Sequence, residues 1–174
     1  MPEVMNDLLT YETRVSTQYS NLTNAILPLS CWEFYGEHFD AKAEFKQDIE
    51  NLNQLSASWE YQLDFYKELV VNKSVIVVTD STLKIVYASH NLERMNGYQP
   101  EEVIGRTPKM FQGEETCAKT SKKIRSAIHA TQIFEESVIN YRKDQSTYIC
   151  AIKGFPILNA KGKLINYVAF EKAA

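Results

Sequence analysis

Glycine and cysteine are scarce in this chain, and no long apolar run occurs in it. The 174 residues include 6 glycines and 3 cysteines. None of the glycines forms a phosphate-binding loop motif. Cys31, Cys117 and Cys150 are too widely spaced for a CxxC zinc pattern, and the three histidines are equally scattered. These absences argue against a disulfide framework, a zinc site and a small enzyme built on a phosphate loop.

The apolar stretches also fall short of the roughly 20 residues that a membrane helix needs. The first residues carry no basic segment followed by an apolar one, which a secretory leader would have. We therefore expect no membrane partner and a cytoplasmic location.

Charge is divided unevenly along the chain, although the net charge is only −3. Residues 1–72 carry 4 Lys and Arg against 12 Asp and Glu, whereas residues 73–174 carry 15 against 10. Such a contrast indicates two differently built segments. The basic residues of the second segment neither dominate it nor alternate with aromatic residues, so we expect no nucleic-acid partner.

The first segment, residues 1–72, is predicted to form a helical extension of about three helices. Asp40 is expected to cap the second helix and Ser58 the third. The apolar residues of the first helix recur at spacings of three and four, which places them on one face: Val4, Leu8, Tyr11, Val15, Tyr19, Leu22 and Ile26. Those of the second and third helices are Phe45, Ile49, Leu52 and Leu55, then Trp59, Leu63, Tyr66 and Val70.

The second segment, residues 73–174, changes to the period of β-strands. The stretches VIVVTD and KIVYAS predict a hairpin, and FEESVINYRKD, STYICAIKGFPIL and KLINYVAFE predict three later strands. Short helices are predicted between the two groups, one beginning at Pro100 and stopped by Gly105, and a longer one capped by Thr116. This order predicts an α+β domain with one antiparallel sheet of five strands.

The stretch NLERMNGYQPEEVIGR, residues 91–106, followed by TPKMFQGEET, resembles a PAS sensor domain of the flavin-binding LOV branch. The resemblance covers residues 73–174. It implies a five-stranded antiparallel PAS sheet with short helices on one face. The N-terminal helical extension would then cover the other face or form a dimer interface there.

The residue that gives LOV domains their photochemistry is replaced. LOV domains carry a Gly-x-Asn-Cys-Arg-Phe-Leu-Gln stretch, and Pro108 occupies the position of its reactive cysteine. A cysteinyl–flavin adduct is therefore excluded at that position. Thr107 replaces the asparagine, Lys109 replaces the phosphate-binding arginine, and Gln112 is retained. Lysine keeps the charge of arginine but not its paired donors.

The resemblance also assigns residues to the far end of the pocket. Arg125 and Asn140 match flavin contacts of the family, whereas Cys150 stands for a second asparagine and Glu171 for a glutamine. Each lost polar pairing costs on the order of 1–3 kcal/mol. We therefore expect no cofactor, with FMN or another flavin as the alternative. Tyr148, Cys150 and Ile152 share one strand face. The candidate pocket residues are Thr107, Lys109, Gln112, Arg125, Asn140, Tyr148, Cys150, Ile152 and Glu171.

The function that follows is a stand-alone PAS sensory or protein-interaction module without an output domain or enzymatic activity of its own. It would pass the state of its pocket or dimer through the N-terminal helices to an unknown signalling partner. We expect a homodimer formed through these helices and the outer sheet face, because both sheet faces are apolar. The alternatives are a flavin or small-ligand sensor of light or redox state without adduct chemistry, and a purely structural dimerisation domain.

Overall fold

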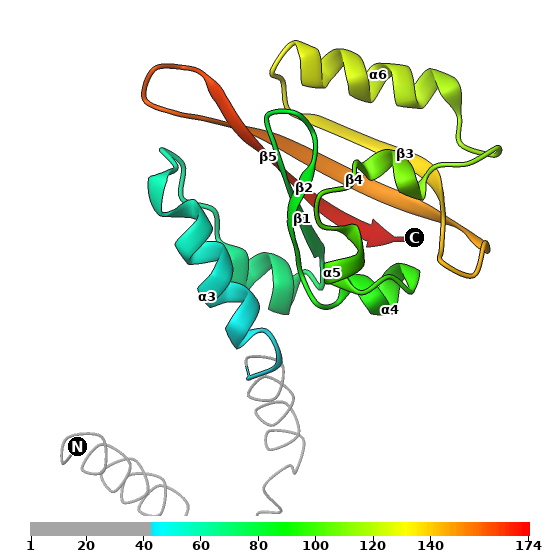
Figure 1. Cartoon of the computed structure of the whole chain (residues 1–174), viewed down its shortest axis with the longest axis horizontal. Helices are drawn as coiled ribbons and strands as arrows, with labels where there is room; N and C mark the ends of the chain where they lie inside the picture. Colours follow the sequence, from blue (N-terminus) through cyan, green and yellow to red (C-terminus); the bar gives the residue numbers. More distant parts are fainter. Residues whose placement is uncertain (1–42) are drawn as a thin grey trace, which may run out of the picture. The chain divides into compact units, whose positions relative to one another are not determined.

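A computed structural model describes residues 43–174 of the chain. The helix predicted over residues 4–26 and the predicted cap Asp40 lie outside the described residues. The described part contains one antiparallel sheet with the strand order β2-β1-β5-β4-β3 (Figure 1). The predicted α+β class and the five-stranded sheet are therefore confirmed. No helix of residues 43–174 has both the length and the apolar character needed to cross a membrane.

The strands follow the β-branched and aromatic stretches of the sequence. They are β1 Val75–Asp80, β2 Ile85–Ala88, β3 Phe134–Tyr141, β4 Thr147–Leu158 and β5 Leu164–Ala173. The last strand, β5, lies between β1 and β4, and pairs Glu171 with both Val75 and Ile152. A strand from the end of the chain thus becomes the centre of the sheet.

The helices between β2 and β3 lie on one face of the sheet. They are α4 Leu92–Asn96, α5 Pro100–Val103, the 3₁₀-helix η3 Pro108–Phe111 and α6 Ala118–His129. Pro100 begins α5, where its missing N–H costs nothing, and Glu102 accepts the N–H of Gln99 at 2.9 Å. Gly105 follows α5 with a φ of +78°, which glycine adopts without strain. Local sequence chemistry therefore sets where α5 begins and ends.

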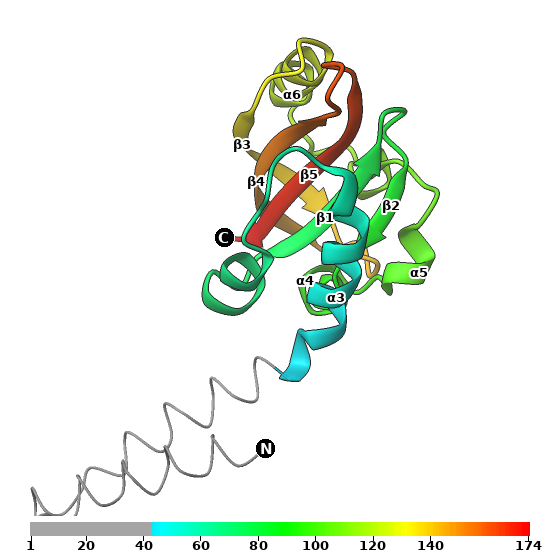
Figure 2. The same cartoon turned by 90° about the vertical axis from the view of Figure 1, so that its left-hand side faces the viewer.

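The N-terminal elements cover the opposite face, as Figures 1 and 2 show for α3. They are α3 Lys46–Leu55, the 3₁₀-helix η1 Ser56–Ser58 and the π-helix η2 Lys67–Val71. Ser58 does not cap a third helix, because the chain is extended at Trp59, whose ring packs edge-on to Phe65. The helical turn begins later, where Asp64 accepts the N–H of Lys67 at 2.9 Å.

Two apolar cores therefore lie on the two faces of the sheet, and β1 contributes to both. Val75 and Val77 pack in the inner core with residues of α4, α5, β3 and β4. Ile76 and Val78 pack in the outer core with residues of α3 and η2. Side chains of a strand alternate between faces, so a central strand covered on both sides must be apolar throughout. The sequence VIVVTD meets that requirement.

A polar cluster fixes α3 to the domain at the edge of the outer core. The buried Asp48 carboxylate accepts hydrogen bonds from the Tyr87 hydroxyl and from His90 Nδ1. His90 Nε2 lies 3.3 Å from Glu44 Oε1, which also pairs with Arg94 at 2.6 Å. Both ring nitrogens of His90 thus face carboxylate oxygens. The cluster ties α3 to β2 and to the start of α4.

Replacing this buried carboxylate tests how much the cluster contributes. Asp48→Asn should lower the free energy of unfolding by about 1–3 kcal/mol, because the amide leaves donors of Tyr87 and His90 poorly paired. Urea unfolding followed by circular dichroism measures the change. Glu50→Gln removes a charge from the exposed side of the same helix and is the matched control. Equal effects of the two substitutions would contradict the assignment.

Candidate functional site

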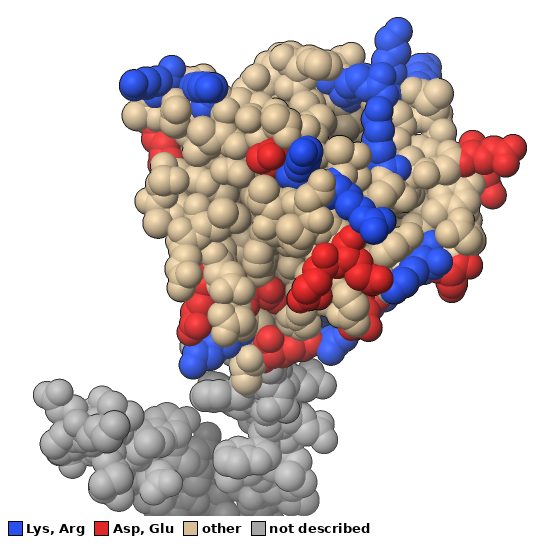
Figure 3. Space-filling view, viewed as in Figure 1, with Lys and Arg blue, Asp and Glu red and all other residues tan. Residues whose placement is uncertain are grey.

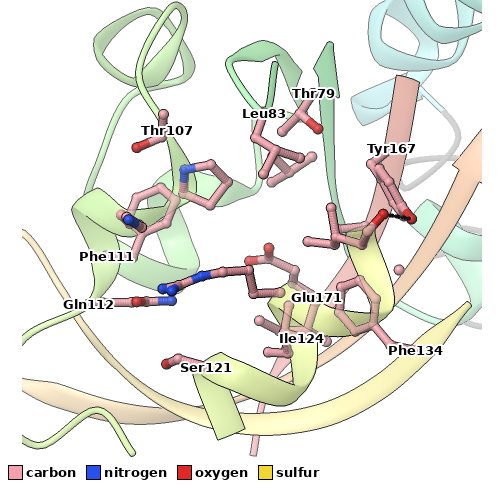
Figure 4. Close-up of a pocket in the computed structure, with 18 of the residues that line it drawn as sticks. Thr79, Leu83, Thr107, Phe111, Gln112, Ser121, Ile124, Phe134, Tyr167 and Glu171 are labelled. Atoms are coloured by element: carbon pink, nitrogen blue, oxygen red, sulfur yellow. Dashed lines mark hydrogen bonds between the residues drawn. The ribbon is translucent and has the colours of Figure 1, made fainter. Parts of the chain in front are cut away.

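A cavity of about 380 Å³ lies between the inner face of the sheet, η3 and α6 (Figure 4). Its walls are mostly apolar, and Phe134 forms part of them because its ring lies against Gly154. A Cβ atom added at Gly154 would come within 2.3 Å of that ring, so the close approach requires glycine. The Tyr167 hydroxyl donates to the Ile128 carbonyl at 3.1 Å and thereby holds α6 to β5. The cavity is thus built into the packing of the domain.

The inner end of the cavity holds buried acceptors. The Glu171 side chain is only 5% exposed, and its polar contact within residues 43–174 is the Cys150 thiol, which donates from 3.7 Å. Burial raises the pKa of Glu171 to about 7, against the opposing effect of that thiol. Asn140 lies beside this end, and its Oδ1 has no hydrogen-bond partner among the described residues. Buried groups of this kind normally have partners.

A second part of the cavity, the mouth, is lined by exposed side chains and carries positive charge. Thr107, Lys109 and Gln112 reach it from η3 and its flanks, and Arg125 reaches it from α6. Within residues 43–174, neither Lys109 nor Arg125 forms an ion pair. The mouth therefore offers two cations and several polar groups to whatever enters.

Seven of the nine residues predicted from the sequence line the cavity. They are Thr107, Lys109, Gln112, Arg125, Asn140, Ile152 and Glu171. Tyr148 and Cys150 do not line it. They share the inner face of β4 with Ile152, but they are buried in the inner core with Leu92 and Met95 of α4. Burial raises the pKa of both side chains.

Several residues that were not predicted from the sequence also line the cavity. Val77 and Thr79 of β1 do so, and so do Leu83, Phe134 and Tyr167. The alternation of β1 was a usable signal for the first two, because alternate residues of a covered strand face one side. The Thr79 hydroxyl is buried and has no partner among the described residues. It adds a second unpaired polar atom, after Asn140 Oδ1, to the wall.

Possible metal ligands are dispersed in the described part of the chain, and basic side chains are dispersed on the face drawn in Figure 3. Residues 43–174 contain no group of three or more His, Cys, Asp or Glu side chains placed to hold a metal ion. On the face drawn in Figure 3, Lys and Arg side chains are interspersed with uncharged and acidic ones rather than forming a continuous basic surface.

An antiparallel five-stranded sheet whose helices enclose a cavity on one face defines the class of PAS-type sensor domains. A sequence profile of the PAS domain family matches residues 72–172, and the chain belongs to this family. LOV proteins are among its relatives, and the chain carries a LOV-like PAS sensor domain of a kind found in signalling proteins.

Three comparisons describe the likeness. Phototropin-2 of Oryza sativa subsp. japonica is 34% identical over 102 residues, which cover 57% of this chain and 11% of that protein. A blue-light-activated histidine kinase of Brucella canis is 32% identical over 87 residues, covering 50% and 18%. The dark structure of the blue-light photoreceptor Aureochrome1 LOV superposes with a TM-score of 0.60 at 29% identity, covering 66% of this chain and 86% of that one. The chain thus spans less than a fifth of these two curated relatives.

The raised pKa of Glu171 predicts a pH-dependent stability. Because the pKa is about 7 in the folded protein and 4.5 ordinarily, folding favours the acid form. That contribution is complete below pH 4.5 and is lost as the pH rises through 7. Glu171→Gln, which carries no charge at any pH, should therefore stabilise the protein by up to about 3 kcal/mol at pH 8.

Urea unfolding at pH 8 and pH 5 measures this difference, which should largely disappear at pH 5. The control is Glu135→Gln on the edge strand β3, where the side chain is 77% exposed. A gain from Glu171→Gln that is the same at both pH values would show that ionisation of Glu171 is not its cause.

Proposed function

We propose that this chain is a sensory module in which the state of the cavity is passed to the N-terminal helices and from them to a partner protein. The observation that carries the proposal is the sharing of β1 and β5 by both sides of the sheet. Val168 of β5 lines the cavity and also belongs to the outer core under α3 and η2. A ligand that moves this strand changes the surface on which the helices rest.

The route from the cavity to α3 is short. Val77 and Thr79 line the cavity, and the residue between them, Val78, packs in the outer core. Tyr87 of β2 pairs with Val78 and donates to Asp48 of α3. Packed cores pass on small displacements because they deform little. Such a switch requires two positions of α3. The ligand must shift the equilibrium between them by binding one more tightly than the other.

The proposed partner is a second copy of the chain, together with a signalling protein that reads the change. Support comes from the part of the outer face toward β3 and β4, where Ile149 is 51% exposed and pairs with Ile139. An apolar patch beside the helices suits association through helices and sheet together. The proposed activity is binding and relay rather than catalysis. The proposed location is the cytoplasm, and neither a membrane nor a nucleic acid is a proposed partner.

A flavin sensor without adduct chemistry is the second candidate, and the mouth of the cavity favours it. Lys109 and Arg125 suit a phosphate tail, and one LOV domain of similar structure has been studied with a flavin analogue. The inner end does not fit the flavin ring. By the family resemblance Glu171 faces the ring edge, where oxidised flavin presents acceptor atoms, and an ionised carboxylate only accepts. The described residues that line the cavity include Pro108 but no cysteine.

Filling the cavity tests the relay without knowledge of the ligand. Ile152→Phe adds a ring to the cavity wall, which should add contacts to the inner face and slow hydrogen exchange of the α3 amides, residues 46–55. Ile133→Phe makes the same change at an exposed position just before β3, outside the cavity, and is the control. Mass-spectrometric hydrogen exchange reads both variants. If the Ile152→Phe protein is folded and hydrogen exchange of its α3 amides is unaltered, the proposed relay is contradicted.

Dimer formation is tested separately by sedimentation. The full chain should sediment as a dimer at micromolar concentration, and Ile149→Lys should weaken the association at least tenfold because it places a charge in the apolar patch. Ala160→Lys, in the exposed turn between β4 and β5, is the control and should leave the association unchanged. A full chain that stays monomeric would overturn the proposed homodimer.

A further inference from the structure

We propose that the cavity takes a flat molecule whose buried edge carries paired N–H donors and whose outer end is anionic. An amidine, a guanidine or an aminated nitrogen heterocycle with a carboxylate or phosphate group has this chemistry. The inference rests on the proposed function only in treating the cavity as the site of the sensed ligand.

The inner end of the cavity favours a ligand that supplies hydrogen-bond donors. Glu171 forms no ion pair within residues 43–174, and the weak donor of Cys150 contacts only one of its oxygens. Asn140 Oδ1 is a further acceptor without a partner at 4% exposure. A buried carboxylate accepts up to four hydrogen bonds and donates none. Two buried acceptor groups that line the same cavity therefore match a ligand edge that carries more than one donor.

The walls and the mouth complete the description of the ligand. Phe111, Ile124 and Phe134 line the cavity around Glu171 in Figure 4, so the ligand also has an apolar part, and a ring suits it. At the mouth, the ammonium of Lys109 and the guanidinium of Arg125 lack acidic partners in the described part of the chain. Cations without partners at the rim of an apolar pocket match an anionic group on the outer end of the ligand.

The pH dependence of the binding affinity also distinguishes this ligand class from a flavin. A donor edge binds the ionised form of Glu171, so its affinity rises with pH. The acceptor edge of oxidised flavin pairs only with the acid form, so its affinity falls with pH. With a Glu171 pKa of about 7, each affinity should change about tenfold between pH 6 and pH 8, in opposite directions.

Three matched probes test the inference on the full chain. Phenylguanidine carries the donor head, benzoate carries only the anion, and 4-guanidinobenzoate joins the two on one ring. At pH 8, phenylguanidine should bind at millimolar concentration and benzoate should bind at least tenfold more weakly. 4-Guanidinobenzoate should bind more tightly than both. Titrations followed by NMR shifts of the amides of residues 140 and 171 give the affinities and the place of binding.

Variants assign each end of the probe. Glu171→Gln should weaken phenylguanidine at least tenfold, whereas Glu135→Gln should not. Lys109→Gln combined with Arg125→Gln should remove the advantage of 4-guanidinobenzoate over phenylguanidine and leave phenylguanidine itself unchanged. Because these residues of the mouth are exposed, the double variant is expected to fold, and circular dichroism checks it.

Several outcomes would overturn the inference. These are no binding of phenylguanidine at millimolar concentration, equal binding of benzoate, or phenylguanidine affinity that Glu171→Gln leaves intact. Binding of lumiflavin, the flavin ring without its tail, that strengthens from pH 8 to pH 6 would assign the cavity to a flavin. The relay fails separately: donor probes that bind through Glu171 but leave α3 hydrogen exchange unchanged would support the ligand class and contradict the sensory mechanism.

Discussion

Burial of β1 on both faces is the constraint on which the rest of the structure depends. Its side chains alternate between the two cores, so Val77 supports the cavity while Ile76 and Val78 support the helices. A strand in this position has no solvent-facing side that could absorb a displacement. In the proposed relay, a change that widens or narrows the cavity acts on the surface under α3, and docking of α3 acts on the cavity in return. The proposed coupling runs in both directions because the same strand borders both cores.

The two cores treat their buried acids in opposite ways. Asp48, on the helix side, has several donors in contact, from Tyr87 and from His90. Glu171, on the cavity side, has the Cys150 thiol as its donor in the described chain and a raised pKa. A satisfied buried acid stabilises one arrangement, whereas an unsatisfied one favours whatever supplies donors or a proton. The first arrangement suits a fixed attachment, and the second suits a site that responds.

The sequence predicted the parts of the fold that local chemistry determines. The apolar run of β1 and the Pro100 and Gly105 signals around α5 depend on neighbours a few residues away. The third helix was wrongly placed at Ser58, because burial of Trp59 in the outer core overrides the local helical pattern. The link between Asp48 and His90 joins residues 42 positions apart. No local periodicity reports such a contact, so it became visible only once the elements were packed.

The same distinction between local pattern and long-range packing applies to the candidate site. Alternation along β4 placed Tyr148, Cys150 and Ile152 on one face, but it does not say how far along the strand the cavity extends. The cover of α4 decides this, because Leu92 and Met95 pack in the same core as Tyr148 and Cys150 and leave Ile152 at the cavity wall. Cys150 therefore affects the cavity through its hydrogen bond to Glu171, and it does not line the cavity itself. A thiol donates one weak hydrogen bond, so it leaves the Glu171 carboxylate short of donors, and that shortage gives the cavity its preference.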